Sequence, residues 1–342
     1  MNLDPLIIQH CAPVIEFAGS ELHAEDLKNI HARQVPRVIR GFAHNWPACS
    51  ITQDTDFADY LLSFYNHKDL GCFVGRPEIE GRFFYEEGLE ALNFSNQRMK
   101  MNDVLAKIQD PQDKQSYYIG SATISAFLEG FCDENELAFD LSQAMPNLIT
   151  SAWLGNQSRI SCHYDTPDNL AVCVHGRRRI VLFAPETIKN LYPGPLHPTP
   201  AGQTVSVVDF HQVDLEKYPN FEHALAHGLI CELEPGDALF IPSMWWHHIE
   251  ALAPLNLLVN YWWHENPPWI GQSISALHAA LLSIKDLPKA QRNAWKAIFD
   301  YYVFDQSDST DHLPASARTF IGESSQLDAK RLRAMLNQRL NT

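Results

Sequence analysis

Two short stretches carry residues that could bind a metal ion. Residues 161–165 read SCHYD, and residues 241–248 read IPSMWWHH. In a β-strand alternate side chains face the same side, so His163 and Asp165 offer an imidazole and a carboxylate at a fixed separation. One histidine from a neighbouring strand would complete two histidines and one carboxylate, which leaves three positions open on Fe(II). Zinc favours a tetrahedral set that is richer in histidine and cysteine.

The second stretch offers two histidines, and the pattern alone does not choose between them. His247 and His248 are adjacent, so in a strand they face opposite sides. A His-x-Asp pair also occurs by chance, as a surface histidine beside a solvated aspartate. Here the pair opens a block of short strands and the doublet lies near the end of that block. This placement favours one metal site built from two distant segments.

The elements that would position these residues are short strands between about 117 and 265. Apolar runs such as LAVCVHG, RRIVLFAP and LNLLVNYWW are separated by Gly, Pro, Asp and Asn, which is typical of an antiparallel sandwich or barrel. Upstream, AEDLKNIHARQ and NFSNQRMKMNDVLAKIQ predict helices, and VPRVIRGFA predicts a short strand. Residues 184–227 predict a long surface insertion. Downstream, three helical stretches follow, the last with Ser325 as its N-cap.

We therefore expect a mainly β core with flanking helices, in three parts. Residues 1–115 are the N-terminal mixed α/β part, 116–266 the β-rich catalytic core, and 267–342 a C-terminal helical region.

Composition narrows the class of protein. There are 26 Lys and Arg against 41 Asp and Glu, and a net charge of −15 disfavours nucleic acid and anionic membranes as partners. The seven cysteines form no Cys-x-x-Cys motif, which predicts reduced thiols. The start, MNLDPLIIQHCAPVIEF, lacks a basic segment followed by a long apolar run. We expect no signal peptide, no membrane span and a cytoplasmic protein.

The run HYDTPDNLAVCVHGRRRIVLFAPETIKNLYPGPLHP, followed by YPNF, LEPGDALFIPSMWWHHIEAL and LLVNYWW, carries a family resemblance. It resembles the JmjC/cupin-like hydroxylases, and within them the asparaginyl hydroxylase type called factor inhibiting HIF and its bacterial cupin-like relatives. The resemblance is continuous from about 150 to 265. It implies a double-stranded β-helix, or jelly roll, that binds Fe(II), the co-substrate 2-oxoglutarate, and O₂.

The resemblance also assigns the metal ligands. His163 and Asp165 match the first two, and the histidine directly after the tryptophan pair, His247, matches the third. His248 then becomes a residue that packs behind the site. The tryptophans at 245, 246, 262 and 263 are expected in the core.

A buried dicarboxylate needs a cation, and the family places one fifteen residues after the first ligand. That residue is Arg178, in HGRRRI. It shares a strand face with Ile180 and Leu182, whereas Arg177 and Arg179 do not, so we expect Arg178 to be the buried one. The alternative is that all three arginines are surface charges of a hairpin.

Three further residues match family positions near the metal and 2-oxoglutarate: Tyr118, Asn169 and Asn260. One position departs from the family. Relatives often carry a threonine three residues before the first ligand, and this chain has Ile160 there. Ser161 or Ser158 could supply the hydroxyl if the local register differs.

The resulting hypothesis is a dioxygenase that hydroxylates an unactivated C–H bond, with a protein or peptide side chain as the expected substrate. A small molecule or a tRNA base is the alternative substrate. A cupin-like module that binds metal or carboxylate without turnover is a second hypothesis, and a zinc hydrolase or isomerase is a third.

One face of a C-terminal helix is apolar and is lined by Trp295, Ile298, Phe299 and Tyr302. Relatives in the family dimerise through such helices, so we expect a homodimer. The alternative is a helical flap over the chain's own barrel.

Overall fold

The computed structural model describes residues 3–19, 23–137, 145, 147–305, 312–314, 317–322 and 325–340. The chain divides into two compact units, Met1–Glu265 and Asn266–Thr342. Every strand of the described residues belongs to the first unit, and the second unit is helical. No helix in the described part of the chain is long and apolar enough to cross a membrane.

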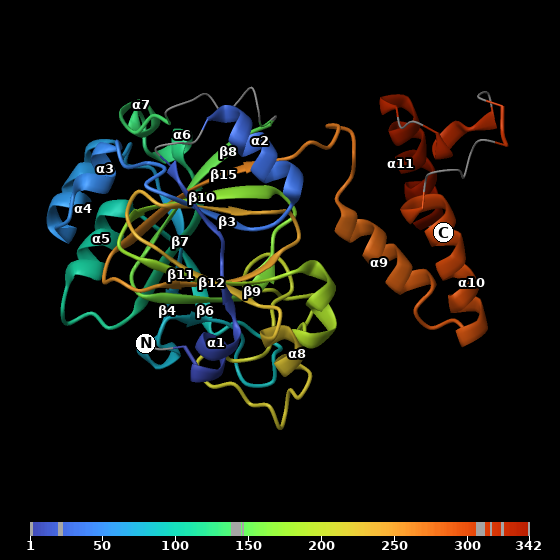
Figure 1. Ribbon diagram of the computed structural model, residues 1–342, viewed down its shortest axis with the longest axis horizontal. Helices are drawn as coiled ribbons and strands as arrows, with labels where there is room; N and C mark the ends of the chain where they lie inside the picture. The colour runs from blue at the N-terminus through green and yellow to red at the C-terminus, as the bar shows by residue number, and fades with distance from the viewer. Residues whose placement is uncertain are drawn as a thin grey trace. The chain divides into compact units, whose positions relative to one another are not determined.

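Two sheets form the centre of the first unit (Figure 1). Within the described residues, one sheet has six strands in the order β1 (Ala12–Pro13), β12 (Leu229–Leu233), β11 (Arg178–Phe183), β14 (Trp246–Ala251), β9 (Ser158–Tyr164) and β5 (Arg82–Phe83). The other has nine, in the order β2 (Glu16–Ala18), β3 (Arg37–Arg40), β13 (Ala238–Ile241), β10 (Asp168–His175), β15 (Asn256–Trp263), β8 (Ile149–Gly155), β7 (Ser116–Thr123), β4 (Leu70–Gly75) and β6 (Phe94–Met99).

The strands β8 to β15 supply four neighbours to each sheet. The row β12-β11-β14-β9 packs against the row β13-β10-β15-β8, and a buried cluster from both rows includes Cys173, Ile180, Leu182 and Leu239. This is the predicted double-stranded β-helix. Alternation along the strands explains it, because one face of each strand meets this interior and the other meets the covering helices.

The outer face of the nine-stranded sheet is covered by helices. They are α2 (Ala24–Arg33), α3 (Pro47–Ser50), α4 (Asp54–Ser63), α5 (Met101–Gln109), α6 (Ile124–Phe127) and α7 (Phe131–Glu134). The largest apolar core lies between them and the sheet, where Phe57 and Leu105 pack with Val172 and Leu257. Helices α4 and α5 lie side by side (Figure 1).

The predicted helix over NFSNQRMKMNDVLAKIQ is wrong in its first half. Residues Phe94–Met99 form strand β6, which pairs with β4 along its whole length, and α5 begins only at Met101. Ser95 and Asn96 are weak helix formers, so the hydrogen bonds of the sheet edge outweigh the apolar spacing that suggested a helix.

Most residues of the predicted surface insertion at 184–227 are exposed or half-buried, but several of its apolar side chains are buried. Its apolar side chains Leu191, Val208, Phe210 and Phe221 are each at most 2% exposed. With α1 (Pro5–His10), the 3-10 helix η3 (Pro185–Asn190) and α8 (Phe221–Leu225), they cover the outer face of the six-stranded sheet. The segment is therefore a surface insertion whose buried side chains form a second apolar cluster against the sheet.

The second unit contains three long helices, α9 (Ser273–Ser283), α10 (Lys289–Phe299) and α11 (Gln326–Leu340). Ser325 caps α11 as predicted, because its Oγ accepts the Asp328 N–H at 3.1 Å. No described side chain of these three helices is buried.

Candidate metal centre

Three side chains from two strands converge in the interior of the barrel. His163 lies near the end of β9, Asp165 follows that strand, and His247 lies on β14. One ligand atom from each lies within 4.8 Å of the other two. The backbone N–H of Met244 donates to the Asp165 carbonyl at 2.8 Å, which ties the turn after β9 to the loop before β14. The strands therefore bring together the three predicted ligands.

An irregularity in β9 decides which side chains face this site. His247 pairs with His163 and Ile249 pairs with Ile160, so two residues of β9 lie opposite one of β14. Such a bulge re-aims the side chains that follow it. Ile160 and His163 consequently both point inward although they are three positions apart, and Cys162 packs in the apolar cluster on the outer face.

Backbone carbonyls orient both imidazoles. Nδ1 of His163 lies 2.8 Å from the Ser161 carbonyl oxygen, and Nδ1 of His247 lies 2.9 Å from that of Trp245. A carbonyl oxygen only accepts, so each Nδ1 carries the hydrogen and each Nε2 keeps its lone pair. A hydrogen bond from Nδ1 to a carbonyl oxygen is the usual way in which a protein orients a histidine that binds a metal through Nε2.

The charge states also suit a divalent cation. Burial, and next the neighbouring His247, lower the pKa of His163 to about 4, so this ring is neutral at pH 7. Burial acts to raise the pKa of Asp165, but the nearby His247 and His163 outweigh it, and the pKa is lowered. Two imidazoles with free Nε2 lone pairs and one carboxylate are the donor set that Fe(II) accepts with open positions.

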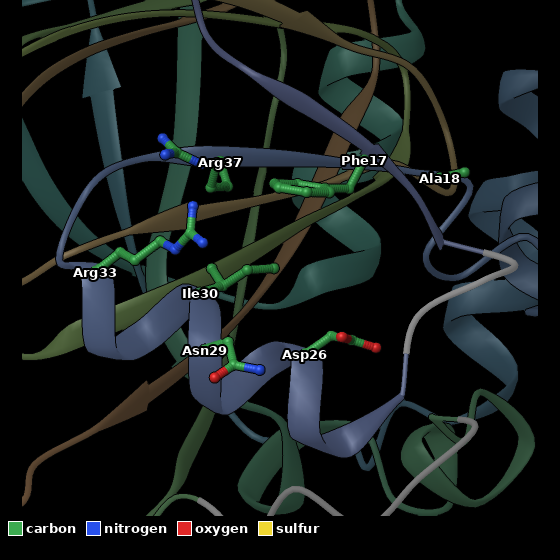
Figure 2. A pocket seen from close by; sticks show the side chains of 7 residues that line it. All are labelled: Phe17, Ala18, Asp26, Asn29, Ile30, Arg33 and Arg37. Atoms are coloured by element: carbon green, nitrogen blue, oxygen red, sulfur yellow. The ribbon is translucent and has the colours of Figure 1, made fainter.

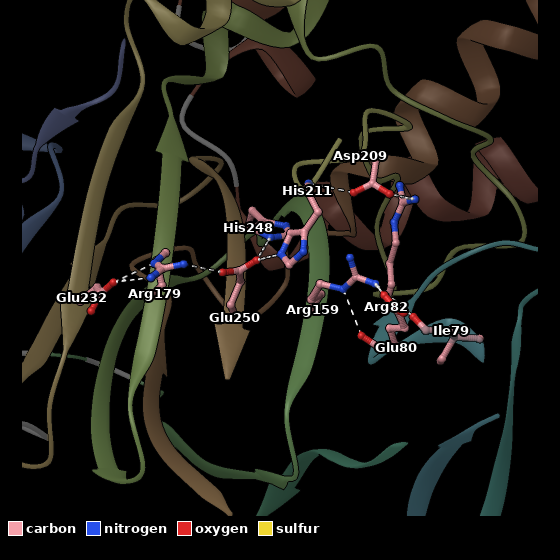
Figure 3. Close-up of polar contacts among 10 residues, drawn as sticks. All are labelled: Ile79, Glu80, Arg82, Arg159, Arg179, Asp209, His211, Glu232, His248 and Glu250. Carbon is pink, nitrogen blue, oxygen red and sulfur yellow. Dashed lines mark hydrogen bonds and ion pairs between the residues drawn. The ribbon is translucent and has the colours of Figure 1, made fainter. Parts of the chain in front are cut away.

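His248 points to the opposite face of β14, where it belongs to a buried polar network (Figure 3). Its Nε2 lies 3.3 Å from Oε1 of Glu250, and its ring stacks on Phe210 with centroids 4.6 Å apart. His211 contacts the same carboxylate, and Arg179 reaches it at 3.4 Å. Burial acts to raise the pKa of Glu250, but the hydrogen bonds from the two histidines hold it well below its usual range.

Of the three consecutive arginines, Arg178 is the one that lies inside the barrel. It is 2% exposed, and its Nη2 donates to the Trp153 carbonyl at 3.2 Å. Its Nε has no hydrogen-bond partner among the described residues. Arg179 instead binds Glu232 at 2.7 Å on the outer face, and the side chain of Arg177 is 56% exposed. Strand alternation thus predicted the orientations correctly.

Tyr118 is a buried residue of β7 whose phenol is influenced by the charges of both Arg178 and Asp165. Its ring packs against Phe83 and Trp153, with centroids 5.6 and 6.1 Å away. Burial raises the pKa of its phenol, while Arg178 lowers it and Asp165 raises it. Both charges therefore act on the same hydroxyl.

The two predicted asparagines form a chain on the opposite wall, with a residue that sequence reasoning missed. Trp153 Nε1 donates to Asn260 Oδ1 at 2.8 Å, and Asn260 Nδ2 lies 3.3 Å from Asn169 Oδ1. Strand alternation puts Ser151, Trp153 and Gly155 on one face of β8, but it does not show that this face turns toward the asparagines. Of the four tryptophans predicted in the core, Trp246 and Trp263 are each 1% exposed, whereas Trp245 and Trp262 are only partly buried.

Ile160 occupies the wall beside Tyr118, where it packs with that tyrosine and Phe83. No hydroxyl therefore arises at position 160. Two residues earlier, the Ser158 hydroxyl is fully buried and has no partner among the described residues. Ser161 contributes its backbone carbonyl to His163.

Two open hollows lie elsewhere on the first unit. A cavity of about 470 Å³ lies between α2 and β3 and is lined by Phe17, Ala18, Asp26, Asn29, Ile30, Arg33 and Arg37 (Figure 2). A shallower groove of about 1070 Å³ lies beside Arg82 and Asp209. Neither includes any of the three convergent side chains, so the chemistry of the barrel interior does not extend to them.

Comparison with known proteins gives consistent matches. The family described as a cupin-like domain matches residues 23–268. Lysine-specific demethylase JMJ31 of Arabidopsis thaliana is 36% identical over 280 residues, which cover 74% of this chain and 50% of the relative. Lysine-specific demethylase 8 of Danio rerio is 29% identical over 239 residues, covering 67% and 53%. tRNA wybutosine-synthesizing protein 5 of Gallus gallus is 32% identical over 146 residues, covering 38% and 43%. The chain spans about half the length of these relatives.

Proposed function

The chain belongs to the JmjC/cupin-like oxygenase family, and from this membership we propose that it is an Fe(II)- and 2-oxoglutarate-dependent dioxygenase that hydroxylates a C–H bond. The observation that carries the proposal is the convergence of His163, Asp165 and His247 within 4.8 Å, with both Nε2 lone pairs available. Its narrower resemblance to asparaginyl hydroxylases of the factor-inhibiting-HIF type stays a prediction.

The metal would bind to His163 Nε2, His247 Nε2 and a carboxylate oxygen of Asp165. The chemistry that Fe(II) would supply there is the activation of O₂ coupled to the oxidative decarboxylation of 2-oxoglutarate, which would yield a hydroxylated substrate, succinate and CO₂. The protein fixes the three ligands on two paired strands and holds the histidines in one tautomer. Neither task requires the metal to be present, so the site is preorganised.

The co-substrate would extend from the metal toward Arg178. An arginine offers a planar fork that matches a carboxylate, and the buried Nε of Arg178 has an unused hydrogen to donate. Tyr118 would donate its hydroxyl to the same carboxylate. Asn169 and Asn260, on the opposite wall, are available to the metal-proximal end of the ligand or to substrate.

The apolar side chains around this path exclude water. Ile180, Leu182, Leu239 and Ile241 are each at most 2% exposed and line the interior between the sheets. Excluding water strengthens the ion pair between Arg178 and a carboxylate, and it protects a reactive intermediate from side reactions.

We propose a protein or peptide side chain as the substrate. The relatives named lysine-specific demethylases support this class, since those names refer to an amino-acid side chain. The relative named for wybutosine synthesis makes a tRNA base the alternative. A net charge of −15 favours the peptide, because binding to nucleic acid draws on Lys and Arg. We also propose that the protein is cytoplasmic.

Succinate formation tests the proposal. Purified protein supplied with Fe(II), 2-oxoglutarate and O₂ should form succinate, faster when a cell extract supplies substrate. His163→Ala and Asp165→Ala should abolish it. Formaldehyde release would indicate N-methyl removal, whereas a stable +16 Da product would indicate hydroxylation of a side chain. Metal and 2-oxoglutarate binding without succinate under any condition would instead identify a non-catalytic binding module.

We further propose that the second unit forms a homodimer. Its long helices bury no described side chain of their own, and yet α10 carries Trp295 and Ile298, each 42% exposed, on one face. Large apolar side chains that remain exposed in an isolated helical unit favour a partner surface.

A further inference from the structure

The buried serine on β9 lies in register with the buried arginine on β11. Arg178 pairs with Ala251 of β14, and Ala251 pairs with Ser158 of β9. Residues directly opposite one another in a sheet face the same side, so Ser158 and Arg178 both point into the barrel. The alanine between them leaves the space above β14 free of a large side chain.

Each of these two side chains has a polar atom with no partner. Ser158 Oγ and Arg178 Nε are fully buried, and neither has a hydrogen-bond partner in the described part of the chain. A buried donor without a partner is unfavourable, and native proteins leave few of them. Two such donors on one row of a barrel interior point to a ligand that accepts hydrogen bonds from both.

The guanidinium of Arg178 crosses the barrel interior to the facing sheet. Its Nη2 donates to the Trp153 carbonyl on β8, the strand that precedes β9 in the chain and lies in the other sheet. On the same strand Gly155 pairs with Tyr118, and a Cβ at Gly155 would lie 3.3 Å from the ring atom Cδ2 of Tyr118. Ser158 follows Gly155 directly after the turn. Ser158, Arg178 and Tyr118 therefore all lie near the turn that joins β8 to β9.

The position where a hydroxyl was expected is apolar. Ile160 fills it and packs against Tyr118 and Phe83. A displacement of two residues along a strand keeps the same face and moves the side chain by about 6.6 Å. Ser158 therefore also points into the barrel, but it lies two residues farther along β9 from the metal ligands than Ile160 does. At that position it is in register with Arg178.

We propose that Ser158 is a positioning residue for the co-substrate, whose hydroxyl donates to the distal carboxylate of 2-oxoglutarate together with Arg178 and Tyr118. This inference rests on the proposed function. A carboxylate offers about four lone-pair sites, enough for a serine, an arginine Nε and a phenol at once. Binding then satisfies the polar atoms that the ligand-free protein leaves without partners.

The test is a calorimetric titration of 2-oxoglutarate into the full chain, loaded with Mn(II) under anaerobic conditions so that no turnover occurs. Ser158→Ala should weaken 2-oxoglutarate binding roughly tenfold or more, because a hydrogen bond to a charged group contributes about 1.5–3 kcal/mol. Mn(II) affinity should not change. The melting temperature of the ligand-free protein should stay equal or rise, because the variant removes a hydroxyl that had no partner.

Ser206→Ala is the matched control. Ser206 is also fully buried, but its Oγ accepts the Val208 N–H at 3.2 Å in the segment that covers the outer face. This variant should lower the melting temperature and leave 2-oxoglutarate affinity unchanged, which is the reverse of the pattern expected for Ser158→Ala.

Two results would overturn the inference while the proposed function stands. One is a Ser158→Ala protein that binds 2-oxoglutarate as the wild type does while Arg178→Ala does not. The other is a loss of affinity in Ser158→Ala that is accompanied by a drop in melting temperature like that of Ser206→Ala, which would indicate a structural effect. If wild-type protein binds no 2-oxoglutarate at millimolar concentration, the proposed function itself fails.

Discussion

The imidazole rings of His163 and His247 lie 4.4 Å apart, centroid to centroid, on directly paired residues of β9 and β14. Their Nδ1 atoms are occupied by backbone carbonyls, and Nε2 of His247 lies 3.6 Å from Oδ2 of Asp165. Two buried imidazoles with lone pairs near a carboxylate are electrostatically unsatisfied without a cation. Binding of a divalent ion should therefore stabilise the first unit.

Removing the metal should lower the melting temperature. An ion present at a hundred times its dissociation constant stabilises the folded state by about 2.7 kcal/mol, provided that it does not bind the unfolded chain. Differential scanning fluorimetry of the chelator-treated protein, with and without added Mn(II), measures this shift. Asp165→Ala should show no shift. An equal shift in wild type and Asp165→Ala would place the stabilising ion elsewhere.

Substitution of the two adjacent histidines, His247 and His248, should have different effects on metal binding. His247→Ala removes a ligand, so it should lose stoichiometric metal as measured by inductively coupled plasma mass spectrometry. His248→Ala should keep the metal but lose stability, since it leaves Glu250 with one hydrogen-bond partner fewer in a buried network. A metal-free His248→Ala protein beside a metal-loaded His247→Ala protein would show that the other histidine is the ligand.

The three arginines should differ in their effect on 2-oxoglutarate binding. Arg178→Ala leaves a buried carboxylate without its cation, which costs about 3–5 kcal/mol, or roughly a hundredfold or more in affinity. Arg178→Lys should lie between, because it keeps the charge and loses the fork. Arg177→Ala should bind normally. Arg179→Ala should also bind normally but be less stable, because Arg179 pairs with Glu232 and Glu250. Calorimetry of the Mn(II) form measures all four, and near-normal affinity in Arg178→Ala would contradict the assignment.

Strand alternation and family motifs predicted most of this site. The inward direction of Arg178 follows from its period-two relation to Ile180 and Leu182, and both the burial of the arginine and its register confirm it. Alternation could not choose between His247 and His248, because both directions are open to a strand of unknown register. The family resemblance chose His247, and the pairing of His247 with His163 places it beside the other ligands.

What the sequence could not predict depends on long-range contacts. The bulge in β9 that turns Ile160 and His163 to one side appears only when β9 pairs with β14. Trp153 enters the site because β8 and β15 are neighbours. The 184–227 segment looked exposed because it is rich in turn residues, yet its scattered apolar side chains, such as Phe210, find partners on an outer sheet face that local patterns do not reveal.

The C-terminal helices should hold two copies of the chain together. Light scattering at micromolar concentration should return about twice 38.8 kDa. The double variant Trp295→Glu, Ile298→Glu should have the mass of one chain, because the two substitutions place charges on the exposed apolar face of α10. Asn293→Glu adds a charge to the opposite side of that helix and should leave the dimer intact. A monomeric wild-type protein would contradict the proposal.

The buried Glu250 should make stability depend on pH. Its pKa is lowered in the folded protein, so between the usual glutamic acid value and the folded value the unfolded chain binds more protons. The stabilisation it provides is therefore complete above about pH 5 and shrinks as the pH falls below the ordinary value. Relative to wild type, Glu250→Gln should lose about 3 kcal/mol at pH 7.

Urea denaturation of the metal-free proteins, at pH 7 and at successively lower pH, measures the difference in unfolding free energy between wild type and Glu250→Gln. This difference should become smaller as the pH falls. Glu232→Gln is the matched control. Glu232 also pairs with Arg179, at 2.7 Å, but its side chain is 43% exposed, so solvent screens the pair and the loss should stay within about 1 kcal/mol. A difference between wild type and Glu250→Gln that widens as the pH falls would mean that Glu250 is protonated in the folded state, contrary to its contacts with His211, His248 and Arg179.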